Sequence, residues 1–144
     1  ALRGWSFLLG NSNPVDPGLL ERAVQAIKRN VDHQARLIDD LLDTFLRQLE
    51  EEPDNHVLRL SIARAGEQFG LPDLAVQQYR DLIKRGALLD EVVADLSDLI
   101  AEHEDEQTLR RLHRTLGDAY SKLGRFREAM EEYSWISGSP RAAK

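Results

Sequence analysis

The four histidines are the first residues to consider for chemistry, because imidazole binds metals and moves protons near neutral pH. They are His33, His56, His103 and His113, and they lie far apart in the sequence. A helical zinc site pairs histidines four residues apart with a nearby carboxylate, and none of the four has such neighbours. We therefore predict surface or boundary histidines and no bound metal.

An acidic cluster is the second candidate. Asp39, Asp40 and Asp43 are the most concentrated carboxylates in a predicted helix, and Asp39 and Asp43 share a face at i, i+4 spacing. A metal site or an acid–base pair is conceivable here. Since nothing near them in the sequence would remove them from water, we favour a solvated face over either kind of site.

No pattern of a covalent catalyst is present. The chain has no cysteine, no nucleophile elbow and no phosphate-binding glycine loop. The glycines Gly117 and Gly124 are interpreted as packing and capping residues of a helix. We therefore predict that the protein is not an enzyme, has no catalytic residue and uses no cofactor.

Composition excludes two further classes of partner. The formal charge of -6 and a pI near 5.2 argue against nonspecific binding to nucleic acid, which needs a basic surface. No apolar run approaches the ~20 residues that span a bilayer, and residues 1–10 lack the cleavage pattern of a secretory signal. We expect no membrane association, and a cytoplasmic location is the default.

The segment from Leu116 to Tyr133 is predicted to be two helices joined by a tight turn. Gly117 is small where the helices must approach closely, and Gly124 suits the left-handed conformation that ends the first helix. Ala129 is a second small residue, placed to face the first helix.

This spacing, Leu116-Gly117-x₂-Tyr120, then Gly124, then Ala129-x₃-Tyr133, resembles the tetratricopeptide repeat, a 34-residue helical hairpin that stacks into a solenoid. A degenerate second copy runs from Arg59 to Leu82, and an extra helix over residues 87–103 separates the two. The resemblance implies an all-α, TPR-like repeat domain over residues 47–139, with a frayed tail at 140–144.

The resemblance also implies a groove lined by the first helix of each hairpin. Its charged residues would be Arg64, Glu67, Arg111, Arg114, Asp118 and Lys122. Arginines bind carboxylates bidentately, so an acidic or C-terminal peptide is the expected ligand. The alternative is an ordinary charged, solvated helix surface.

The first part of the chain has a different pattern. No helix breaker occurs between Pro17 and Pro53, and apolar residues recur there at alternating steps of four and three, interrupted only at Gln34: Leu20, Val24, Ile27, Val31, Ile38, Leu41 and Phe45. This 3.5-residue period predicts one long helix that packs lengthwise against others.

Residues 20–43 resemble the second helix of a sensor histidine kinase dimerisation domain, and Ala1 to Leu9 resembles the end of the first helix. The phosphoacceptor histidine box is absent, so His33 does not inherit that role. The resemblance implies that residues 1–46 form a long-helix antiparallel hairpin. Two copies would complete a four-helix bundle through the seven apolar residues above, which makes the expected assembly a homodimer.

Together these patterns predict a non-catalytic protein–protein interaction module with a self-associating N-terminal hairpin. The alternative is a dimerising fragment of a two-component signal-transduction protein. A natural fusion, a fragment and an engineered fusion are all compatible with two resemblances that meet near residues 43–46.

Overall fold

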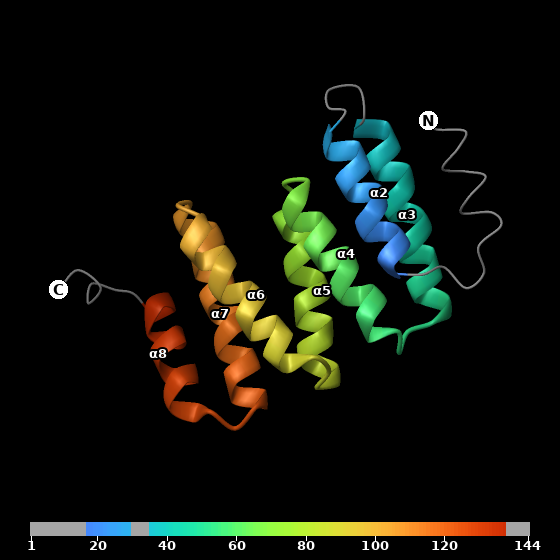
Figure 1. The fold of residues 1–144 in the computed structure, drawn as a ribbon. Helices are drawn as coiled ribbons and strands as arrows, with labels where there is room; N and C mark the ends of the chain where they lie inside the picture. Colours follow the sequence, from blue (N-terminus) through green and yellow to red (C-terminus); the bar gives the residue numbers. More distant parts are fainter. Residues whose placement is uncertain (1–16, 30–34, 138–144) are drawn as a thin grey trace. The chain divides into compact units, whose positions relative to one another are not determined.

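The computed structural model describes residues 17–29 and 35–137 (Figure 1). All regular secondary structure in these ranges is α-helical, as predicted. The helices are α2 (Pro17–Arg29), α3 (Ala35–Glu51), α4 (His56–Gln68), α5 (Pro72–Arg85), α6 (Leu89–Glu102), α7 (Glu106–Lys122) and α8 (Phe126–Ser137).

Local side-chain chemistry sets where several helices begin. The Asn55 side chain accepts a hydrogen bond from the Leu58 backbone N–H at 3.0 Å and caps α4. Pro72 is the first residue of α5, where its missing N–H costs nothing. Asp105 caps α7 by accepting from the Thr108 backbone N–H at 2.8 Å. The hydrogen bonds from Thr108 lower the Asp105 pKa because they favour its carboxylate form.

Glycine in the left-handed region ends α7, as predicted. Gly124 has φ +80°, and the Arg125 N–H donates to the Tyr120 carbonyl at 2.8 Å. This bond closes the helix end and reverses the chain into α8. Gly86, with φ +64°, follows α5 in the same left-handed conformation.

The chain divides into two compact units, residues 1–71 and 72–144. The first unit contains α2, α3 and α4, and the second contains α5 to α8. The sequence predicts a domain boundary between residues 46 and 47, which lies inside α3. That boundary marks where the two sequence resemblances meet, and it remains a prediction. The two helices of the degenerate repeat copy, α4 and α5, belong to different units.

In the first unit, α2 and α3 both pack against α4, and they run in opposite directions (Figure 1). Two separate helices therefore replace the single long helix predicted for Pro17 to Pro53. This arrangement covers apolar side chains that one extended helix would leave bare, because each half can bury them against α4. The expected pairing partner, residues 1–9, lies outside the described residues.

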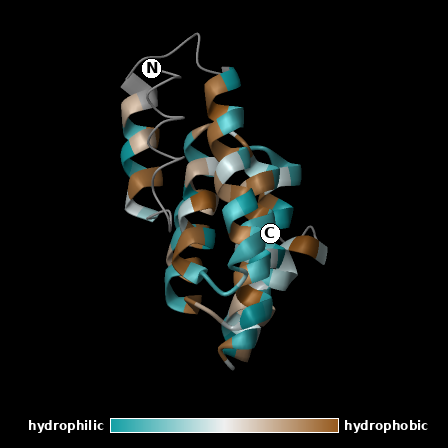
Figure 2. Cartoon of the chain, turned by 90° about the vertical axis from the view of Figure 1, so that its right-hand side faces the viewer, coloured by the Kyte–Doolittle hydropathy of each residue, from teal (hydrophilic) through white to brown (hydrophobic). Residues whose placement is uncertain are grey.

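In the second unit, α7 packs against each of the other three helices, α5, α6 and α8. Hydrophobic and hydrophilic residues alternate along the helices (Figure 2), as expected where one face is buried. Leu96, Leu112 and Tyr79 are among the fully buried side chains. The Tyr79 hydroxyl donates to Asp95 of α6 at 2.9 Å, so this buried phenol keeps a hydrogen-bond partner. The extra helix predicted over residues 87–103 is α6.

In the α7–α8 hairpin, the two helices are in close contact at Gly117. A Cβ atom added at Gly117 would lie 2.6 Å from Cε1 of the Tyr133 ring, so only glycine leaves room for that ring. Ala129 is buried, as the prediction of a small residue facing the first helix requires. The close contact of the two helices thus depends on residue size at both positions.

Candidate anion-binding site

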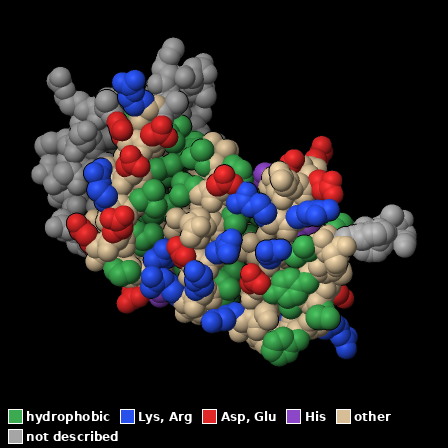
Figure 3. All heavy atoms as spheres, turned by 180° about the vertical axis from the view of Figure 1, so that it is seen from behind, with side chains coloured by type: hydrophobic (Ala, Val, Ile, Leu, Met, Phe, Trp, Pro, Cys, Tyr) green, Lys and Arg blue, Asp and Glu red, His purple; other side chains and the backbone are tan. Residues whose placement is uncertain are grey.

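A hollow on the second unit is lined by four arginines. Its volume is about 560 Å³, and its lining comes from α5, α7 and α8: Val76, Arg80, Gln107, Thr108, Arg110, Arg111, Arg114, Thr115 and Ile136. Figure 3 shows Lys and Arg side chains over the part of the molecule that these helices form. The chain as a whole is acidic, so this local excess of arginine is a distinct feature.

The spacing of residues on α7 explains how these arginines come together. Gln107, Arg110, Arg111 and Arg114 are related by steps of three and four, which place them on one face of the helix. Arg80 approaches from α5 and adds a fourth guanidinium. The hollow is therefore built by one face of α7 together with α5 and α8, and not by a loop.

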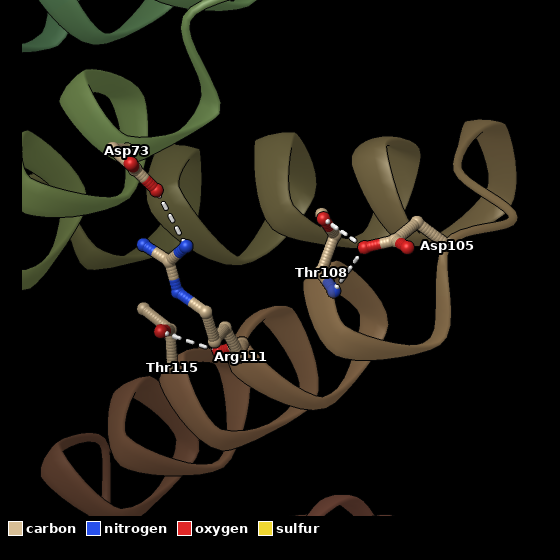
Figure 4. A network of polar contacts seen from close by, with 5 residues as sticks. All are labelled: Asp73, Asp105, Thr108, Arg111 and Thr115. Carbon is tan, nitrogen blue, oxygen red and sulfur yellow. Dashed lines mark hydrogen bonds and ion pairs between the residues drawn. The ribbon is translucent and has the colours of Figure 1, made fainter.

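Two of the four arginines have carboxylate partners. Arg110 pairs with Glu106 one turn earlier in α7, at 3.3 Å. Arg111 reaches from α7 to Asp73 in the first turn of α5, at 2.5 Å (Figure 4). The Asp73 side chain is 86% exposed and that of Arg111 46%, so water screens this pair. Exposed pairs of this kind are worth at most about 1 kcal/mol, and an external anion can compete with Asp73.

Arg80 and Arg114 make no ion pair with any residue in the described ranges, and both are exposed. Val76 and Ile136 add an apolar wall beside them. Thr115 is not available as a donor, because its hydroxyl already bonds the Arg111 carbonyl at 2.7 Å. Guanidinium groups bind carboxylates and phosphates through paired hydrogen bonds, so the hollow suits an anion attached to a short apolar group.

Of the six charged residues predicted to share one groove, four lie on α7 in the second unit and two on α4 in the first, so the shared groove remains a prediction. Arg111 and Arg114 line the hollow. Asp118 and Lys122 lie further along α7. Arg64 and Glu67 lie on α4, in the first unit. Within the first unit, Arg64 borders a smaller hollow of about 160 Å³ between α2 and α4.

Asp118 has a structural partner. It accepts a hydrogen bond from the Tyr133 hydroxyl of α8. Burial and this hydrogen bond to a carboxylate raise the pKa of Tyr133 to about 12, since both disfavour the phenolate. Asp118 therefore holds the α7–α8 hairpin together.

The residues predicted to form a dimer interface are largely covered within one chain. Leu20, Val24, Leu41 and Phe45 are each at most 4% exposed, and Ile38 is half-buried. The side chains of Ile27 and Val31 lie outside the described residues. Association through the four buried residues would require the first unit to open.

His113 differs from the prediction of a surface or boundary histidine. It is 6% exposed, its Nδ1 lies 2.7 Å from Glu132 Oε1, and its ring stacks on Trp135 with centroids 4.5 Å apart. Both contacts link α7 to α8. Sequence spacing could not indicate them, because the partners are 19 and 22 residues away.

The remaining candidates for chemistry stay separate. His56 and His103 are half-buried on different elements, and Asp39, Asp40 and Asp43 are exposed, as the solvated interpretation predicted. No group of three or more potential metal ligands occurs in residues 17–29 and 35–137. His33 lies outside these ranges.

Arg80 and Arg110 were missed as site residues. The i, i+3, i+4, i+7 spacing from Gln107 to Arg114 was a signal that could have indicated Arg110. Arg80 is separated from these residues by α6, so no local pattern could place it there.

Comparisons of this chain with models of known protein families, with curated proteins and with solved structures find no match. Among the described helices, none combines the length and the apolar character that crossing a membrane requires.

Proposed function

We propose that this protein is a non-catalytic interaction module that binds an acidic segment of a partner protein in the arginine hollow of α5, α7 and α8. The observation that carries the proposal is the convergence of four arginines from two helices on one hollow, two of them without a carboxylate partner in the described residues. Unpaired guanidinium groups on a concave surface are suited to carboxylates.

The ligand we propose is a peptide with carboxylate groups and at least one apolar side chain. Arg80 and Arg114 would bind the carboxylates from opposite sides, and Val76 and Ile136 would contact the apolar group. The helical hairpins are proposed to be TPR-like, on the sequence resemblance given above. The alternative of a two-component signalling fragment stays a prediction of the N-terminal resemblance.

The test is the binding of fluorescently labelled hexaglutamate to the full chain, followed by fluorescence anisotropy. We expect saturable binding that weakens as salt is added, because exposed charges are screened over about 8–10 Å at physiological ionic strength. A labelled hexalysine peptide should not bind at the same site.

The decisive variant is Arg80→Glu with Arg114→Glu, which reverses both unpaired charges. We expect affinity to fall at least about tenfold, since each arginine contributes a charge-assisted contact. Arg47→Glu is the matched control, because Arg47 is an exposed arginine of α3 outside the hollow. Equal loss in the control, or unchanged binding in the double variant, would refute the site.

A further inference from the structure

The outer face of α8 exposes two large apolar side chains. Phe126 is 65% exposed and Met130 69% exposed. They are four residues apart and therefore lie one above the other on the same face of the helix. Ala129, by contrast, is buried, so the exposed pair lies on a different face of α8 from the one that the hairpin covers. α8 is the last helix of the described residues (Figure 1).

Opposite charges flank this apolar pair on one side. Arg127 and Glu131 each follow one of the two apolar residues, and both are exposed. Neither makes an ion pair with any residue of the ranges that the structure describes. In this order along a helix, with the basic residue first, the two charges interact less favourably with each other than in the reverse order. Both remain available to an outside partner.

We propose that this face of α8 is an interface between two copies of the chain, in which the two α8 helices pack antiparallel. When two helices pack antiparallel about a two-fold axis, the same flank of each helix faces the other. Arg127 of one copy would then lie opposite Glu131 of the second copy, and the reverse pair forms by symmetry. Phe126 and Met130 would pack across the axis.

In a parallel pair Arg127 would not lie opposite Glu131. A parallel pair would bring the flank with Arg127 and Glu131 against the opposite flank of the second helix. That flank contains Ala129, which is already buried by α7. Because the two charges of this flank are self-complementary only in the antiparallel pair, they favour a second copy in that direction as the occupant.

This interface is independent of the arginine hollow. Ile136, the residue of α8 that lines the hollow, lies roughly a third of a turn from Met130 around the helix axis. One helix of 12 residues per copy buries less than the roughly 1,200 Å² of a standard interface, so we expect a weak and reversible dimer.

The test is sedimentation equilibrium of the full chain over a rising concentration series. We expect the mean mass to rise from that of the 16.4 kDa chain toward twice that value. Met130→Lys should keep the chain monomeric. Ala94→Lys adds the same charge at an exposed position of α6 and should dimerise like the wild type.

Charge exchange tests the antiparallel pairing itself. Arg127→Glu and Glu131→Arg should each weaken dimerisation at least about fivefold, because each places like charges opposite one another. The double variant restores opposite charges and should dimerise within about twofold of the wild type. Circular dichroism of each variant checks that the helices persist.

Three results would overturn the proposal: a wild-type monomer at the highest attainable concentration, a Met130→Lys variant that dimerises normally, or a double variant that stays as weak as the single ones. A dimer that survives Met130→Lys but is lost on substitution of Phe45 would point to the first unit instead.

Discussion

Asp73 pairs with Arg111, one of the four arginines whose guanidinium groups an acidic ligand would use. Its carboxylate lies 2.5 Å from Arg111, in a pair that water screens. Asp73 is therefore both a weak tether between α5 and α7 and an internal competitor for ligand. The affinity of the hollow would be set by this residue as well as by the arginines.

Replacing Asp73 by asparagine should therefore strengthen binding of hexaglutamate. The expected gain is about two- to fivefold, the range that corresponds to one exposed ion pair. Asp98→Asn is the control, since Asp98 is an exposed carboxylate of α6 outside the hollow. If Asp73→Asn weakens binding, Asp73 positions Arg111 for the ligand and does not compete with it.

At the scale of helices, the α7–α8 hairpin depends on the absence of a side chain at one position. Replacing a glycine by alanine within a helix normally gains about 1 kcal/mol of helix propensity. At Gly117 the added methyl group would meet the Tyr133 ring at 2.6 Å. The ring would have to move, which threatens its hydrogen bond to Asp118.

We expect Gly117→Ala to lower the free energy of unfolding by roughly 1–2 kcal/mol, as overpacking of a tight contact does. Urea denaturation followed by circular dichroism measures this change. In a Tyr133→Leu background the penalty should shrink, because the ring that causes it is gone. A penalty of the same size in both backgrounds would mean that the ring contact is not the cause.

Helix boundaries were predictable because their causes are local. Asn55, Pro72, Gly86 and Gly124 each act within four residues of where they stand, so the sequence alone reveals them. The contacts between helices were not predictable in this way. The approach of Arg80 to the α7 arginines depends on how helices pack, and spacing along the chain does not encode it.

The break of the long N-terminal helix was missed for a related reason. The 3.5-residue period of residues 20–45 fits one long helix and two shorter ones equally well, and only Gln34 interrupted the pattern. Burial against α4 favours the two-helix arrangement. The period showed which apolar residues share one helix face. It did not show which other helix packs against that face.

For the whole molecule, the division into two units has a direct consequence. Every residue that lines the arginine hollow belongs to residues 72–144. We expect a fragment of residues 72–144 to give a helical circular dichroism spectrum and to bind hexaglutamate with an affinity close to that of the full chain. A fragment that is unfolded would show that the hollow depends on the first unit.

The stack of Trp135 on His113 gives the second unit an optical reporter of its own. The fluorescence of an indole depends on the group that lies against its ring, and here that group is an imidazole of the neighbouring helix. The chain has only one other tryptophan, Trp5. With Trp5 replaced by phenylalanine, Trp135 would be the only tryptophan left. Its fluorescence would then change when α7 separates from α8, so the rate at which this hairpin opens could be measured in the intact chain.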